Sequence, residues 1–325
     1  MSHPVPHSSV TEQAGPRPAA HNDTSTPFNL VSLPALIAKE YDGRGLRLDH
    51  VISEQLGFTR YHIRYLSGDL EISGVMNVPN RPGKHPVLVL AHGWANPENY
   101  TSGSGLAREQ AYLAANGFVV LHTDYRNHAD SDGEAAGWTV GPAAAPVRRP
   151  LGYPEDLVNA VLALKAADLP FADTGRIGLF GRSMGGGVAL NALVARPGLF
   201  DAAVLYSPVS SLAEDNFDRW VVPDLRTGDL NRRVVDAYGS PEDNPGFWAR
   251  ASSRSYLDRV EVPVQIHHGL ADETCPVQWS EATARALRDA GKEVQLFEYP
   301  GEPHRFDQSW PTLMRRTVEF FRTRL

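Results

Sequence analysis

Apolar runs alternate with amphipathic stretches along most of the chain, and this pattern predicts strands and helices in turn. Continuous apolar runs such as 86–91 and 202–206 are typical of strands that are covered on both faces, as in a parallel sheet. The full predicted series is strand 86–91, helix 104–116, strand 118–123, helix 154–167, strand 176–180, helix 184–195, strand 202–206, strand 263–268, helix 278–290, strand 294–299 and helix 309–324. This alternation indicates an α/β fold with a mostly parallel, doubly wound sheet.

The N-terminal part of the chain has a different pattern. Residues 1–27 are rich in Pro, Ser and Thr and contain no apolar core of a signal peptide, so we expect a disordered tail. Residues 28–60 are expected to form a helical lead-in. The main domain, 61–325, is expected to open with an antiparallel hairpin of strands 61–65 and 70–78.

Two long segments, 127–152 and 207–259, interrupt the alternation. Long connections at the carboxyl edge of an α/β sheet lie over the ligand crevice, so we expect 207–259 to form a small cap-like excursion. Aromatic residues there and nearby are candidates for a substrate pocket, with a small core of the excursion as the alternative. The substrate-binding candidates are Trp138, Phe217, Trp220 and Trp248.

Composition restricts the partners of the protein. The chain has 325 residues with 42% hydrophobic content, which suits one large core, and a net charge of −7, which argues against nucleic acid and anionic membranes as partners. Cys275 is the single cysteine, so no intrachain disulfide forms, and we interpret it as a small packing residue. With no apolar run long enough to span a membrane, a cytoplasmic location is expected.

Ser183 lies in Gly181-Arg-Ser-Met-Gly185, between a predicted strand and a predicted helix. This is the pattern of a nucleophile elbow, in which a sharp turn projects the serine hydroxyl out of the sheet and the glycines leave room for neighbouring backbone. The alternative is a tight strand-to-helix turn with an incidental serine. The pattern therefore makes Ser183 a candidate nucleophile.

An acid and a histidine follow Ser183, each just after a predicted strand. Asp272 follows strand 263–268 and His304 follows strand 294–299, which gives the chain order Ser, Asp, His of α/β-hydrolases. We predict that His304 is the general base and that Asp272 orients it. Glu273 and Glu302 are alternatives for the acid. Asp272 could otherwise be a turn or helix-cap residue and His304 a surface residue.

The segment after strand 86–91 supplies a candidate oxyanion hole. It reads His92-Gly-Trp94, and a glycine there lets backbone approach the substrate. The predicted donors are the backbone N–H groups of Trp94 and Met184, and His92 is interpreted as a residue that holds the loop. No pair of histidines with a nearby carboxylate has a metal-site spacing, so no metal and no cofactor are predicted.

Residues from about 61 to the end resemble the α/β-hydrolase catalytic domain of the prolyl-oligopeptidase-like group, which includes acylaminoacyl-peptidase-like enzymes and small esterases. The matching segments are 86–94, 181–187, 206–208, 256–263, 268–272 and 299–306. The resemblance implies an α/β-hydrolase fold and a serine hydrolase that acts on a small ester or a short peptide. It also implies a Ser183, Asp272 and His304 triad, since Asp272 occupies the acid of the family's Gly-x-x-Asp pattern.

The chain departs from this group in three ways. Arg305 stands where a glycine usually follows the catalytic histidine, Trp94 replaces a second glycine of the oxyanion loop, and the length leaves no room for the β-propeller of the large peptidases. We therefore expect cleavage of carboxylic esters through an acyl-enzyme. The alternatives are a peptidase of short peptides, an acyltransferase, and a non-catalytic binding module on the same fold.

Overall fold

The computed structural model describes residues 32–133, 145–225 and 229–325. In these ranges one nine-stranded sheet has the order β1-β2-β3-β5-β4-β6-β7-β8-β9. The strands are β1 Arg44–Glu54, β2 Phe58–Ser67, β3 Leu70–Pro79, β4 His85–Ala91, β5 Val119–Thr123, β6 Ala172–Arg182, β7 Ala202–Tyr206, β8 Val264–Gly269 and β9 Val294–Tyr299. Strands β1, β2, β3 and β5 pair antiparallel, and the strands from β5 to β9 pair in parallel.

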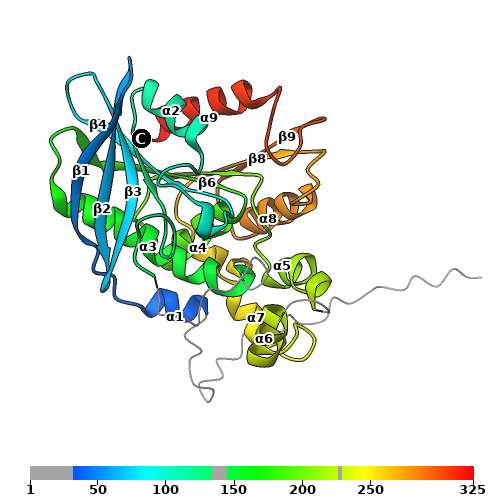
Figure 1. Cartoon of the computed structure of the whole chain (residues 1–325). Coiled ribbons are helices and arrows are strands. Elements are labelled where there is room, and N and C mark those ends of the chain that lie inside the picture. The colour runs from blue at the N-terminus through cyan, green and yellow to red at the C-terminus, as the bar shows by residue number, and fades with distance from the viewer. Residues whose placement is uncertain (1–31, 134–144, 226–228) are drawn as a thin grey trace, which may run out of the picture.

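Helices cover both faces of the sheet (Figure 1). They are α1 Leu33–Ala38, α2 Ala107–Ala115, α3 Ala145–Ala167, α4 Met184–Ala195, α5 Ala213–Trp220, α6 Asp229–Tyr238, α7 Pro245–Ala251, α8 Val277–Asp289 and α9 Trp310–Arg324, with short 3₁₀ turns at Pro97–Asn99, Val222–Asp224 and Ser253–Arg259. Helices α2 and α9 pack on one face, and α3, α4 and α8 pack on the other. This arrangement is an α/β-hydrolase fold, as the sequence predicts.

Strands β5 and β7 are buried at every position, which explains the continuous apolar sequence of β7 and the apolar residues 119–121 that precede the buried His122 and Thr123 in β5. Helix α4 is buried along its whole length of 12 residues. It is built from Gly, Ala, Val and Leu, with Met184 and Asn191, and its small residues let it pack closely against β4 and β6. The helix that begins beside Ser183 is therefore enclosed in the core.

The predicted elements agree closely with the structure, and the bounds of α4, β7 and β9 are the predicted ones. Two differences stand out. Helix α3 begins at Ala145 instead of 154. Strand β1 lies within 28–60, so the prediction of a helical lead-in is wrong there, although α1 does form.

The hydrophobic pattern did not predict strand β1, and the structure shows a physical reason. Most of its residues are exposed, and it lies at one edge of the sheet. Charged side chains hold it against its neighbours: Arg47 lies 2.9 Å from Glu71 on β3, and Asp49 lies 2.9 Å from Arg64 on β2. A strand of this kind depends on backbone pairing with β2, and backbone hydrogen bonds do not require a regular spacing of apolar residues in the sequence.

Candidate active site

Ser183 joins β6 to α4 in a strained conformation. Its φ of 57° and ψ of −125° are rare for a residue with a side chain. Backbone hydrogen bonds hold it there: Ser183 N donates to Tyr206 O at 3.0 Å, and Ser183 O accepts from Gly186 N at 2.9 Å and Val209 N at 3.1 Å. Such strain costs on the order of 1–3 kcal/mol, and the three contacts offset it.

The glycines of the turn are required by close backbone approach. A Cβ on Gly181 would lie 2.3 Å from Gly185 O, and a Cβ on Gly185 would lie 2.0 Å from Ala91 O. Any larger residue would push α4 away from β4 and β6. The turn therefore has the geometry that the nucleophile-elbow pattern predicts for Ser183.

Asp272 and His304 are in contact. Oδ2 of Asp272 lies 2.8 Å from Nδ1 of His304, while Oδ1 accepts the N–H groups of Thr274 at 2.9 Å and Cys275 at 2.8 Å. Burial alone would raise the pKa of Asp272, but hydrogen bonds from His268, His304 and the Cys275 N–H hold that pKa well below its usual range. The carboxylate is thus ionised, and with Nδ1 engaged, Nε2 of His304 is left for a nucleophile.

Backbone hydrogen bonds connect the loop that carries the acid to the loop that carries the histidine. Leu270 N donates to Tyr299 O, and Ala271 N donates to Glu302 O, both at 3.0 Å. The buried Glu302 carboxylate accepts the backbone N–H groups of Asp307 and Ser309, which follow His304. These bonds fix the distance between the two loops.

The structure also distinguishes among the three residues considered for the role of the acid, which are Asp272, Glu273 and Glu302. Glu302 is occupied in holding its own loop. Glu273 is exposed, and its carbonyl accepts a hydrogen bond from the Arg219 guanidinium. Of the three, Asp272 is the one in contact with His304.

The loop after β4 passes directly against the nucleophile. A Cβ on Gly93 would lie 3.1 Å from Ser183 Cβ, so only glycine permits this approach without a shift. Trp94 follows, with 49% of its surface exposed. Met184 is the first residue of α4, so its N–H has no acceptor within the helix. The Met184 N–H follows Ser183 in the chain, and Trp94 follows the glycine that approaches Ser183 in the fold. The role of these two N–H groups as oxyanion donors stays a prediction.

His92 is buried beneath this loop. Its ring nitrogens lie 2.6 Å from Gly93 O and 3.2 Å from Asp124 O. Burial lowers the pKa of His92 to about 4, so the ring is neutral at neutral pH. These contacts suit the predicted role of holding the loop.

Two further residues meet the candidate triad, and the sequence pattern assigned them no such role. His268 is fully buried, and its Nε2 lies 3.1 Å from Oδ2 of Asp272. The Cys275 side chain is also fully buried and close to that of Ser183; burial raises the pKa of the thiol, and a hydrogen bond with Ser183 partly offsets this. The spacing His-Gly-x-x-Asp was the available signal for His268.

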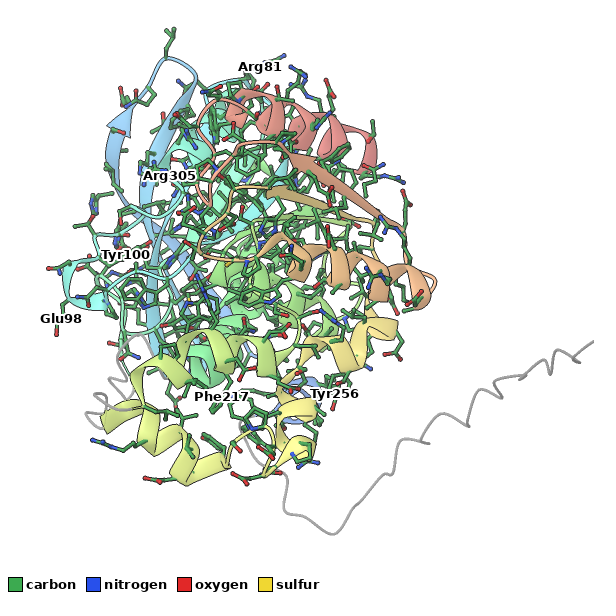
Figure 2. The ribbon with its side chains drawn as sticks, turned by 90° about the vertical axis from the view of Figure 1, so that its right-hand side faces the viewer. Arg81, Glu98, Tyr100, Phe217, Tyr256 and Arg305 are labelled. Carbon is green, nitrogen blue, oxygen red and sulfur yellow. The ribbon has the colours of Figure 1, made fainter. Side chains whose placement is uncertain are left out.

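The predicted substrate-binding aromatics are not gathered at one place. Phe217 and Trp248 are 4% and 2% exposed and pack against each other, with ring centroids 4.8 Å apart, in a hydrophobic cluster of the excursion itself. In Figure 2, Phe217 lies among the helices of the excursion, and Arg305 lies higher, towards the sheet. A pocket-lining role does not fit this packing, and the alternative of a small separate core does.

Trp220 is partly exposed and lies 5.5 Å from Trp279, ring centroid to centroid. It remains the candidate that borders the acid loop. Trp138 lies outside the described residues. Within the described ranges, no group of three or more His, Cys, Asp and Glu side chains could hold a metal ion, and no helix is long and apolar enough to cross a membrane.

Comparison with solved structures relates this fold to peptidases and to esterases. The uncomplexed acylaminoacyl peptidase of Pyrococcus horikoshii superposes with a TM-score of 0.64 at 25% identity, over 84% of this chain and 42% of that one. Acetyl xylan esterase 1 of Thermoanaerobacterium sp. JW/SL YS485 gives a TM-score of 0.62 at 17% identity, over 89% and 92% of the two chains. The second likeness shows the fold alone.

Curated sequences give a similar result. The uncharacterized peptidase YtmA of Bacillus subtilis is 24% identical over 76% of this chain and 86% of its own length. The acylamino-acid-releasing enzyme of Arabidopsis thaliana is 25% identical over 69% of this chain, but this match spans 28% of that enzyme. The matches to the peptidase YuxL and to feline dipeptidyl peptidase 4 likewise span about a quarter of those proteins, 25% and 23%.

The profile of the prolyl oligopeptidase family, peptidase S9, matches residues 105–325. The matched range contains the Ser183 elbow, the acid loop and the histidine loop, and therefore all three residues of the candidate triad. The chain belongs to the prolyl oligopeptidase family of serine hydrolases.

Proposed function

We propose that this protein hydrolyses small carboxylic esters through an acyl-enzyme on Ser183. The observation that carries the proposal is the combination of a strained nucleophile elbow with a buried Asp272 carboxylate 2.8 Å from His304. A serine is a weak nucleophile until a neighbouring base accepts its proton, and a histidine oriented by a carboxylate is the usual base.

The proposed reaction has two halves. In the first, Nε2 of His304 takes the Ser183 proton as Oγ attacks the ester carbonyl, and then returns it to the leaving alcohol. In the second, the same nitrogen activates a water that releases the acid and regenerates Ser183. The N–H groups of Trp94 and Met184 stabilise the oxyanion in both halves, each contributing roughly 3 kcal/mol.

A peptidase is the second candidate, because the family and the acylaminoacyl peptidase likeness favour it. A peptidase that trims from an amino terminus needs acids to hold that amine. The three acids at the start of the excursion do not form such a group: Asp215 accepts a hydrogen bond from Ser210, while Glu214 and Asp218 are exposed on α5. This observation favours the ester over the peptide.

The chemistry of the leaving group gives a quantitative expectation. An amine must be protonated as the tetrahedral intermediate collapses, whereas an alcohol leaves more readily, so amide cleavage depends more on placement of the leaving group. We expect kcat/KM for p-nitrophenyl acetate or butyrate to exceed that for aminoacyl-p-nitroanilides by at least ~10²-fold, or ~2.7 kcal/mol of transition-state stabilisation.

The test combines an active-site probe with a substrate panel. A fluorophosphonate should add its mass to Ser183, and Ser183→Ala and His304→Ala should each reduce ester turnover by about 10⁴-fold, with the double variant little slower than either. An anilide rate equal to the ester rate would establish the peptidase instead. Transfer to an added alcohol in preference to water would indicate an acyltransferase, and an unlabelled Ser183 would indicate a binding module.

A further inference from the structure

His268 is the next-to-last residue of β8, and its ring is held at both nitrogens. Nε2 lies 2.8 Å from Cys275 O and 3.1 Å from Oδ2 of Asp272, and Nδ1 lies 2.6 Å from the Ser280 hydroxyl on α8. The side chain has no exposed surface. A fully buried histidine with three polar neighbours, one of which is the catalytic carboxylate, is not explained by packing alone.

The partners fix which nitrogen carries the proton. A carbonyl oxygen can only accept, so the contact with Cys275 requires a hydrogen on Nε2. The same nitrogen lies 3.1 Å from Asp272 Oδ2. In the neutral ring, Nδ1 accepts the Ser280 hydroxyl, which sets the rotation of the imidazole.

The consequence concerns the orientation of the acid. Oδ2 of Asp272 has His304 on one side and His268 on the other, at 2.8 and 3.1 Å. Without the His268 donor, Oδ2 would keep a single partner, His304, which lies on a separate loop. The carbonyl of Cys275, whose N–H binds Oδ1, would also lose its donor. Both losses would loosen the acid loop at the point where it faces His304.

We propose that His268 is a positioning residue that holds the Asp272 carboxylate in the orientation required by His304, through a chain from Ser280 to His268, Asp272 and His304. The proposal rests on the proposed function, because it assigns His304 as the base. Displacing a catalytic group by about 1 Å reduces turnover by up to about 10²-fold, so the loss of His268 should have an effect of tenfold to 10²-fold on kcat.

The chain offers a matched control in the neighbouring residue. His267 is also fully buried and hydrogen-bonded at both nitrogens, 2.8 Å from the Tyr299 hydroxyl and 2.8 Å from Gln265 Oε1, but it packs on the opposite face of the sheet. Replacing either His267 or His268 therefore removes a buried, hydrogen-bonded histidine and affects folding. Only His268 contacts Asp272.

The experiment measures kcat and KM for p-nitrophenyl acetate, with melting temperatures, in His268→Leu, His268→Gln and His267→Leu. We expect His268→Leu to lower kcat by tenfold or more with KM changed less than about twofold. His268→Gln, which keeps an N–H donor, should recover most of this loss even if the leucine variant folds poorly. His267→Leu should lower the melting temperature and leave kcat within about twofold.

A double variant separates positioning from general structural support. If His268 acts through Asp272, adding His268→Leu to Asp272→Asn should slow the enzyme by less than about twofold beyond Asp272→Asn alone. The proposal is wrong if the two losses multiply, if His268→Gln is as slow as His268→Leu, or if His267→Leu lowers kcat equally.

The rate of fluorophosphonate labelling of Ser183 is measured in parallel, because it depends on the base and not on the ester. Slow labelling in His268→Leu supports the positioning role even if the natural substrate is a peptide. Fast labelling in this variant, with slow labelling in His304→Ala, overturns the role of His268 and leaves the triad intact. Equal labelling in all variants, His304→Ala included, overturns the proposed function and the positioning role with it.

Discussion

At the scale of single residues, buried histidines make the stability of the protein depend on pH. Burial lowers the pKa of His92 to about 4 and of His267 to about 3, and lowers that of His122 well below its ordinary value of 6.5. Below pH 6.5 the unfolded chain therefore binds protons that the folded protein does not, so the free energy of unfolding falls as the pH decreases. Each site contributes up to about 1.4 kcal/mol per pH unit.

His122 gives a direct test of this dependence. Its ring stacks 5.3 Å from that of His92, and neither ring nitrogen has a hydrogen-bond partner among the described residues. Replacing it with phenylalanine keeps a planar ring and removes one titrating group. In urea unfolding at pH 6.5, 5.8 and 5.0, His122→Phe should lose stability less steeply than the wild type, by about 0.7 kcal/mol per pH unit near pH 6.5 and by up to about 1.4 near pH 5.0. Parallel curves for the two proteins would contradict this account.

The sequence predicted the candidate triad residues because each has a local signal. Ser183 has flanking glycines, and Asp272 and His304 each follow an apolar strand. His268 lies in the His-Gly-x-x-Asp segment, but this spacing does not indicate that its side chain contacts the acid. Adjacent residues of a strand face opposite sides of a sheet, and the choice between His267 and His268 depends on which face of β8 meets α8, which periodicity does not specify.

At the scale of elements, the excursion of 207–259 is a small helical unit, and the end of α5 connects it to the acid loop and to α8. Its own cluster contains Phe217 and Trp248, while at the end of α5 the Arg219 guanidinium donates to the Glu273 carbonyl and Trp220 lies against Trp279. The aromatics of one segment therefore divide between an internal core and the border of the site. Composition alone did not distinguish these two groups.

Paired substitutions test this division. Trp220→Ala should raise KM for bulky esters such as p-nitrophenyl benzoate by about fivefold and leave that for the acetate within about twofold. Phe217→Ala removes a buried ring from the internal core, so it should cost about 3–5 kcal/mol of stability in the excursion without this dependence on ester size. Equal effects of Trp220→Ala on both esters would show that the residue does not contact the acyl group.

At the scale of the whole molecule, the parallel strands β4 to β9 were predictable, while the outer antiparallel strand β1 was not. A strand covered on both faces is mostly apolar, so the five apolar residues of β7 and the first three residues of β5 indicate buried strands in the sequence. Strand β1 is exposed along most of its length and is held by its pairing with β2. The start of α3 at Ala145 was also unforeseen, because Pro154 is a typical first residue of a helix and instead lies inside α3.

The burial of α4 has a consequence for how the enzyme fails on heating. All 12 residues of this helix are buried, and it starts at the nucleophile, so the amides beyond its first turn can meet solvent only when the surrounding sheet opens. In native-state hydrogen exchange, peptides covering 188–195 should exchange at the rate of global unfolding, and peptides from 213–251 should exchange sooner. Similar rates for the two regions would contradict this order. If it holds, the helices within 213–251 can melt and reform while Ser183 stays in place, and irreversible inactivation by heat has to begin with unfolding of the sheet.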